Sequence, residues 1–104
     1  MIIVTTESVP GREIAETLGV VRGNTIRARH LGHDVVAGLK GLVGGEIHDY
    51  TKLMGEAREQ AMDRMSQQAA AMGADAVVNV RLGTSMIMQM AAEIVAYGTA
   101  VKLR

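Results

Sequence analysis

The sequence predicts an α+β fold, a mostly antiparallel sheet with one long helix and one or two short helices on one face. Three stretches lead to this prediction. Residues 47–72 carry apolar side chains at helical spacing, whereas residues 76–82 and residues 93–104 alternate as strands do. The expected order of elements is strand, short helix, strand, helix, long helix, strand, strand. Such an order places the helices together on one side of a single sheet.

The first part of the chain is expected to form two strands joined through a short helix. Residues 1–5 are apolar and β-branched, as in a strand. A Pro-Gly pair then marks a turn, and residues 12–18 leave room for barely two helical turns. Residues 19–30 alternate imperfectly around a central Gly-Asn pair, which fits either a hairpin turn or one bent, bulged strand. We favour the bent strand.

The next stretch predicts a short helix that depends on its packing. Residues 30–45 carry apolar side chains at helical spacing, but five glycines interrupt them. Each glycine inside a helix costs about 1 kcal/mol relative to alanine. The last two of these glycines, Gly44 and Gly45, are expected to break the chain before the long helix.

The long helix is the clearest element in the sequence. Its apolar positions recur every three or four residues, and charged or amide side chains fall between them. These apolar positions are Ile47, Tyr50, Leu53, Met54, Ala57, Ala61, Met65, Ala69 and Met72. A stripe of alanine and methionine is shallow, so the helix can lie close to a sheet. Gly73 follows immediately, where a left-handed residue often closes a helix.

The C-terminal third predicts the strands that the long helix covers. In residues 76–82 we expect Val78, Val80 and Leu82 to lie under the helix. The methionine-rich residues 83–92 fit either a strand or a loop.

The last strand has one face of small residues and one of large residues. The small residues, Ala96, Gly98 and Ala100, would admit a helix closely. The opposite face is too apolar for water, so we expect a partner subunit to cover it. That face holds Val95, Tyr97, Thr99, Val101 and Leu103.

The composition indicates one small domain, residues 1–104, whose core contains few aromatic side chains. There are two Tyr, no Phe and no Trp, so aliphatic residues and eight Met must fill the interior. Eleven basic and eleven acidic residues give zero net charge, which disfavours binding to nucleic acid or to an anionic membrane. The chain has no Cys, no apolar segment long enough to span a bilayer and no signal-peptide pattern. We therefore expect a cytoplasmic protein.

Several motifs occur together along nearly the whole chain. In order they are MIIVTT, GxVxGxTIRARHLG, AGLKGLVGGE, TKxMxEAREQAMDRM, GADAVVNVR and AYGTAVK. This combination resembles the YbjQ-type family, which is named for heavy-metal binding. The resemblance implies a dodecin-subunit-like β/α subunit that assembles into a ring-shaped homopentamer, in which additional short strands help to join subunits. It implies no particular reaction and no agreed catalytic residues.

Four residues with side chains that bind metals lie near the glycine-rich stretch. His30, His33 and Asp34 fall within five residues, and His48 follows the glycine break. Zinc, nickel or copper accepts such ligands, so a divalent transition metal is the candidate cofactor. The set would need His48 or another subunit to complete it. The alternative is structural, with His30 at a strand end and the other two histidines in water at helix starts.

Two further candidate sites are weaker. Met86, Met88 and Met90 would place three thioethers on one side of a strand, which suits Cu(I) or Ag(I). We favour the alternative that these methionines fill the core, because the chain has no Phe.

A small anion is the second of these candidates. The amides of Gly44, Gly45 and Glu46 at the start of the long helix are suitable donors. Tyr50 and Arg58 are eight residues apart on roughly the same helix face and could point toward such a ligand.

These observations favour a homo-oligomeric binding or structural protein that holds a metal or a small ligand. The family resemblance implies that the oligomer is a pentamer. One alternative is an enzyme with an active site shared between subunits near His30, His33, Asp34 and Tyr50. Another is a purely structural oligomer. No Ser/His/Asp arrangement is visible in the sequence, so a binding protein is favoured over an enzyme.

Overall fold

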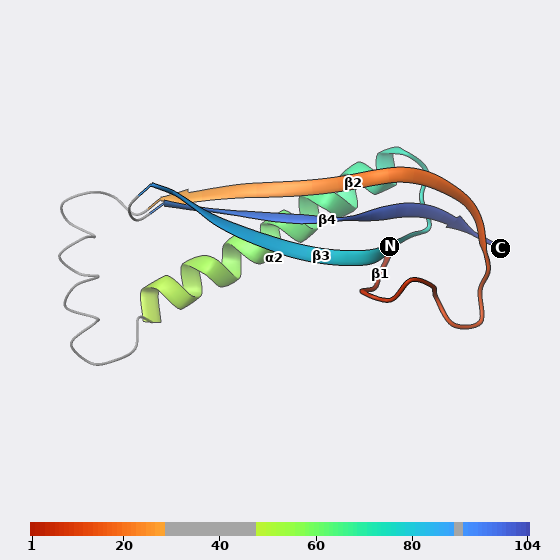
Figure 1. The fold of residues 1–104 in the computed structure, drawn as a ribbon, viewed down its shortest axis with the longest axis horizontal. Helices are drawn as coiled ribbons and strands as arrows, with labels where there is room; N and C mark the ends of the chain where they lie inside the picture. Colours follow the sequence, from red (N-terminus) through yellow and green to blue (C-terminus); the bar gives the residue numbers. More distant parts are fainter. Residues whose placement is uncertain (29–47, 89–90) are drawn as a thin grey trace.

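A computed structural model describes residues 1–28, 48–88 and 91–104 of the chain (Figure 1). These ranges contain one helix and one four-stranded sheet. The elements are β1 (Ile2–Ile3), β2 (Ile14–Ala28), α2 (His48–Ala71), β3 (Ala76–Met88) and β4 (Ala91–Leu103). The short helix expected within residues 30–45 lies outside the described residues.

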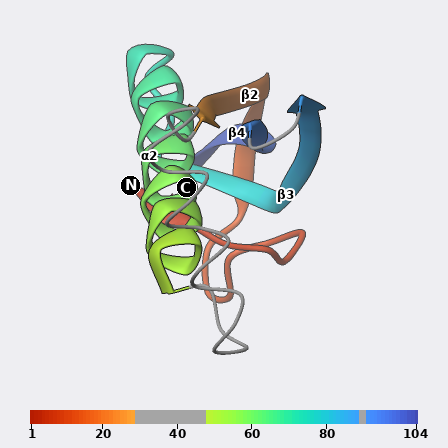
Figure 2. The ribbon, with the colours of Figure 1, turned by 90° about the vertical axis from the view of Figure 1, so that its left-hand side faces the viewer.

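The sheet is mixed, with strand order β1-β3-β4-β2. The short strand β1 runs parallel to β3, while β4 lies between β3 and β2 and is antiparallel to both. Seen from the end, the molecule has two layers, with α2 on one side and the strands on the other (Figure 2). The predicted α+β architecture is confirmed, with a helix on one side of a single mixed sheet.

The core lies between α2 and the small-residue face of β4. The helix contributes alanines and one large side chain, Met65, that has no exposed surface. The buried members of this cluster are Val21, Ala57, Ala61, Met65, Ala69, Val77, Val80, Ile94, Ala96 and Ala100. The prediction that the face of Ala96 and Ala100 admits the helix is therefore confirmed.

The strand β2 approaches α2 most closely at Gly23. A Cβ atom placed on Gly23 would collide with the backbone of Ala61 and Met65. Next to it, the buried Thr25 hydroxyl donates a hydrogen bond of 3.0 Å to the Ala57 carbonyl. Only a residue without a side chain lets the two backbones meet here.

The C-terminus of α2 has the predicted glycine closure. Gly73 is left-handed, with φ of 80°. The Ala74 N–H donates to the Ala69 carbonyl at 3.1 Å, and the Gly73 N–H donates to the Ala70 carbonyl at 3.0 Å. This pair of bonds is a Schellman motif, which satisfies two carbonyls that the helix leaves free.

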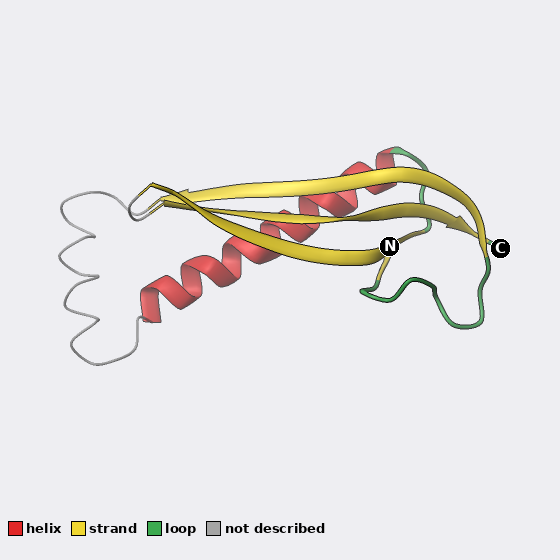
Figure 3. Cartoon of the chain, viewed as in Figure 1, coloured by secondary structure: helices red, strands yellow, loops and turns green. Residues whose placement is uncertain are grey.

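The short helix predicted for residues 12–18 is wrong. Most of this stretch is the first part of β2, where Ile14 pairs with Leu103 and Thr17 with Val101 (Figure 3). A seven-residue segment forms few helical hydrogen bonds, whereas pairing with β4 satisfies its backbone. The predicted single strand is confirmed, but its register shifts lie between Ile14 and Gly19 rather than at the Gly-Asn pair.

The predicted orientation of β3 is wrong in part, because the strand contains a bulge. Asn79 has a φ of 53°, and the register against β4 shifts between Val78 and Arg81. As a result Val77 and Val80 both join the core under α2, while Val78 packs on the opposite face. Leu82 pairs with Ala96 on the face of the sheet that carries α2, but it is 46% exposed, so of the three residues expected under the helix only Val80 joins the core. Beyond the bulge, residues 83–88 continue as strand.

The face of the sheet opposite α2 is partly covered by the chain itself. The side chains of Ile2, Val4 and Val9 from the N-terminal segment pack there on a second buried cluster. This cluster consists of Ala76, Val78, Val101 and Leu103. The expectation that a partner covers Val101 and Leu103 is therefore wrong, because the N-terminal segment covers them. The rest of this face has no such cover within the described residues.

Candidate functional site

The uncovered part of the sheet lies on β2 and β4, and we call it the open face. Because Val21, Gly23 and Thr25 face α2, the alternating residues of β2 face away from it. They stand opposite the corresponding residues of β4 in the sheet register. The open face consists of Val20, Arg22, Asn24 and Ile26 from β2 and Glu93, Val95 and Tyr97 from β4.

Apolar side chains are strongly exposed on the open face. Val20 is 74% exposed, Ile26 60% and Tyr97 44%. Single exposed apolar residues are common, but several on one sheet face make it a candidate interaction surface. The partner predicted for the apolar face stays a prediction for this part of it.

A cluster of three polar side chains, Arg22, Asn24 and Glu93, interrupts the apolar residues of the open face. Arg22, Asn24, Glu93 and Val95 line a surface depression of about 350 Å³. The Asn24 Nδ2 donates a 3.4 Å hydrogen bond to Glu93 Oε2, which holds the carboxylate beside the amide. A guanidinium, an amide and a carboxylate can bind a polar ligand, but the side chains of Arg22 and Asn24 are exposed. Water competes for such groups, so the depression alone supports weak binding.

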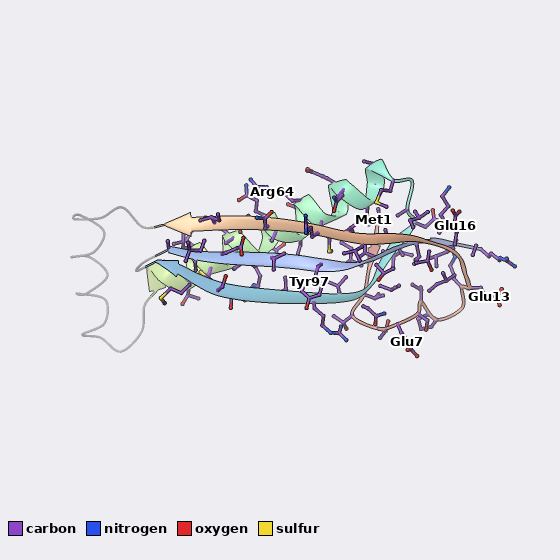
Figure 4. The ribbon with its side chains drawn as sticks, turned by 45° about the horizontal axis from the view of Figure 1, so that its top comes forward. Met1, Glu7, Glu13, Glu16, Arg64 and Tyr97 are labelled. Carbon is purple, nitrogen blue, oxygen red and sulfur yellow. The ribbon has the colours of Figure 1, made fainter. Side chains whose placement is uncertain are left out.

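Side chains of α2 reach the outer edge of β2 next to this depression. The Arg22 N–H donates to Gln68 Oε1 at 2.7 Å, and Arg64 donates to the Asn24 carbonyl at 2.7 Å. Figure 4 shows Arg64 on α2 beside β2, and Tyr97 on the sheet. These bonds fix α2 against β2 and occupy backbone groups that an edge strand otherwise presents to solvent.

Most of the residues predicted from the sequence to form a site lie outside the described residues. This holds for His30, His33, Asp34, Gly44, Gly45 and Glu46. His48 and Tyr50 are in the first turn of α2, but their side chains are not described. Arg58 is exposed on α2. The metal and anion sites therefore stay predictions. Within residues 1–28, 48–88 and 91–104 no three His, Cys, Asp or Glu residues gather to hold a metal ion.

Of Met86, Met88 and Met90, only Met86 has a side chain that the structure describes, and it does not lie in the core. Met86 is 76% exposed on β3, so the favoured interpretation is wrong for this residue. Met88 ends β3, but its side chain is not described, and Met90 lies outside the described residues. The Cu(I) site stays untested.

The polar cluster of the open face, Arg22, Asn24 and Glu93, was not among the residues that we singled out from the sequence. Arg22 and Asn24 alternate with the residues of β2 that face the helix, and Glu93 precedes the buried Ile94 of β4. This two-residue period was the available signal. It was obscured because the Gly-Asn pair also resembles a turn.

No helix in the described ranges is long and apolar enough to cross a membrane.

Comparison with known proteins gives a clear family match. A protein-family model, YbjQ_1, with the description “Putative heavy-metal-binding”, matches residues 1–104. A UPF0145 protein from Archaeoglobus fulgidus is 61% identical over 104 residues, which make up 100% of this chain and 96% of that protein. A UPF0145 protein from Vibrio campbellii is 57% identical over 103 residues, 99% of each chain.

A solved structure has a similar fold. It is the crystal structure of a protein of unknown function from Pediococcus pentosaceus, described as a member of the DUF74 family. The TM-score is 0.64 at 16% sequence identity, and the match covers 100% of this chain and 98% of that one. At this identity the similarity concerns the fold alone.

Proposed function

Because the chain belongs to the YbjQ-type family, we propose that it is the subunit of a homo-oligomeric binding protein whose ligand site forms where subunits meet. The observation that carries this proposal is the group of strongly exposed apolar side chains on the open face. Val20 is 74% exposed, Ile26 60% and Tyr97 44%. Several exposed apolar side chains on one sheet face are typical of a surface that binds another protein. Association through the open face would remove these apolar side chains from water, which is the dominant favourable contribution to most protein association.

The finer features of the proposal come from the sequence and the family. We propose a ring of five copies in the cytoplasm, with no role in nucleic-acid binding. The ligand is a heavy metal held by His30, His33, Asp34 and His48, which offer the imidazole and carboxylate donors that transition metals accept. A small anion at Gly44, Gly45, Glu46, Tyr50 and Arg58 is the second candidate ligand. The family description supports the metal.

A substitution on the open face tests the assembly. Val20→Lys places a charge on a side chain that is 74% exposed, so the monomer fold should tolerate it while a covered face should not. Gln67→Lys adds the same charge at an exposed position of α2 and serves as the matched control. We expect sedimentation velocity to give a smaller species for Val20→Lys and an unchanged one for Gln67→Lys. An unchanged species for Val20→Lys would contradict the role of this face.

Metal analysis tests the ligand separately. Protein purified without a histidine tag should carry transition metal in fixed proportion to the chain, and a His30→Ala/His33→Ala variant should lose it. Elemental analysis by mass spectrometry gives the ratio directly. Wild-type protein that takes up no stoichiometric zinc, nickel or copper after incubation with each ion would refute the metal site.

A further inference from the structure

Arg22 and Glu93 carry opposite charges on the open face but do not neutralise each other. Both line the depression of about 350 Å³, yet within residues 1–28, 48–88 and 91–104 they form no ion pair. The hydrogen bond that joins Arg22 to α2 is donated by its backbone N–H. The guanidinium therefore has no partner in the part of the chain that the structure describes, and its five N–H donors are available to a ligand.

The register of β2 against β4 gives the order of the groups along the depression. Three cross-strand pairs follow one another, Arg22 with Tyr97, Asn24 with Val95, and Ile26 with Glu93. The first and third pairs are separated by roughly 13 Å along the strands, at about 3.4 Å per residue. The positive charge thus lies at one end of the depression and the negative charge at the other, with an amide and an apolar side chain between them.

The negative end of the depression can accept several hydrogen bonds. Asn24 Nδ2 donates to Glu93 Oε2 at 3.4 Å, which turns the carboxylate toward the amide. Glu93 Oε1 and Asn24 Oδ1 then have no donor among the described residues. An ammonium group has three N–H donors and can bind both oxygens. At the positive end, a guanidinium suits a carboxylate, which it can bind through two parallel hydrogen bonds.

These two ends favour a zwitterion over a ligand with a single charge. An anion bound at Arg22 would gain from the guanidinium but would be repelled by Glu93, and a cation bound at Glu93 would be repelled by Arg22. A molecule with one carboxylate and one ammonium group satisfies both ends. The depression is near the small end of ligand pockets, which hold about 300–1,000 Å³, so it fits a ligand as small as a free amino acid.

The surroundings of the depression favour an apolar side chain on this ligand. Val95 is part of its lining, and Tyr97 and Ile26 stand next to its two charged ends in the sheet register. Tyr97 is 44% exposed and Ile26 60%. An apolar ligand side chain in contact with them would remove apolar surface from water on both molecules.

We propose that the depression binds a free α-amino acid with an apolar side chain, with its carboxylate on Arg22 and its ammonium group on Glu93 and Asn24. All three polar side chains come from one chain, so this site goes beyond the proposed function and needs no second copy. A copy that covers the open face would enclose the ligand, which would neutralise two charges that are costly to bury unpaired. For so small a ligand on largely exposed groups, we expect a dissociation constant of about 1–10 mM.

An NMR titration of isotope-labelled wild-type protein with L-leucine tests the site. We expect saturable shifts of the Asn24 Nδ2 and Arg22 Nε signals. Isocaproate is leucine without its ammonium group and isoamylamine is leucine without its carboxylate, so they are matched control ligands and should bind at least about threefold more weakly. No saturable shift with leucine up to about 50 mM would overturn the proposal, and so would equal affinities for all three compounds.

Two substitutions assign the ends of the ligand. Arg22→Gln should weaken leucine binding at least about threefold without weakening isoamylamine binding, because isoamylamine has no carboxylate. Glu93→Gln should weaken leucine binding as much without weakening isocaproate binding. Lys102→Gln and Glu59→Gln remove the same charges at exposed positions outside the open face and should bind leucine as wild type. Wild-type leucine affinity in both Arg22→Gln and Glu93→Gln would overturn the site.

The outcomes separate this site from the proposed assembly. An assembled wild-type protein that does not bind leucine overturns the amino acid site and leaves the oligomer intact. A monomeric protein that binds leucine contradicts the oligomer and leaves the site intact. If a variant fails to fold, the comparison of leucine, isocaproate and isoamylamine on the wild-type protein decides the question.

Discussion

At Gly23 the absence of a side chain determines how closely α2 can lie on the sheet. A Cβ there would meet the Ala61 carbonyl and the Met65 amide, which are helix backbone and cannot rotate away. Gly83 is a glycine of β3 in a different setting. Its added Cβ would lie 3.4 Å from Val95 Cγ1, the end of a side chain, which is ordinary contact.

We therefore predict opposite effects for two alanine substitutions. Gly23→Ala must push α2 away from β2 and should lower the free energy of unfolding by about 1–3 kcal/mol. Gly83→Ala should leave it unchanged or raise it by up to about 1 kcal/mol, because alanine restricts the unfolded chain. Urea unfolding at one fixed protein concentration measures both. Equal stability of Gly23→Ala and wild type would contradict the close packing of α2 on β2.

Single residues also explain where sequence reasoning failed. The alternation of residues 76–82 is regular, so nothing in the sequence distinguishes Val77 from Val78 as the residue under the helix. The left-handed Asn79 reverses the alternation within the strand. Such a bulge depends on the backbone of β4 and of the N-terminal segment, which lie far away in the sequence.

At the level of elements, the helix was predictable because its signals are local. The spacing of apolar residues and the glycine after the last turn are properties of neighbouring residues, and α2 ends as expected. The start of β2 was not predictable in this way. Residues 12–18 are compatible with a short helix in isolation, and only pairing with the end of β4 makes most of them a strand.

Gly55 inside α2 and Gly73 just after its end should respond in opposite directions to alanine. Gly73 is left-handed, so Gly73→Ala should destabilise the protein by about 1–2 kcal/mol. Gly55 lies inside the helix and its added Cβ would meet only Arg58, at 3.8 Å, so Gly55→Ala should stabilise by up to about 1 kcal/mol. Thermal unfolding compares the two variants. A Gly73→Ala variant as stable as Gly55→Ala would mean that the Schellman closure contributes little.

At the scale of the whole molecule, the sequence indicated the exposed apolar face only in part. The shortage of aromatic residues and the apolar last strand predicted a partner for Val95, Tyr97, Val101 and Leu103. In the structure Val101 and Leu103 lie in a cluster on which the N-terminal segment packs, whereas Tyr97 is 44% exposed beside Val20 and Ile26 of β2. The packing of the N-terminal segment on this cluster is a tertiary contact, so the sequence pattern could not reveal it.

The proposed function requires that identical chains complete one another. The exposed apolar side chains of the open face are the part of the structure on which this proposal rests. A closed ring of the proposed kind would also need a second, different contact surface on each subunit.

Native mass spectrometry of the untagged wild-type protein at micromolar concentration tests this claim most directly. We predict one dominant species with five times the mass of the 11.1 kDa chain. A different closed number of copies would correct the size of the ring and keep the shared interfaces. A stable species of 11.1 kDa would contradict the account, because the open face would then have no second copy to cover it.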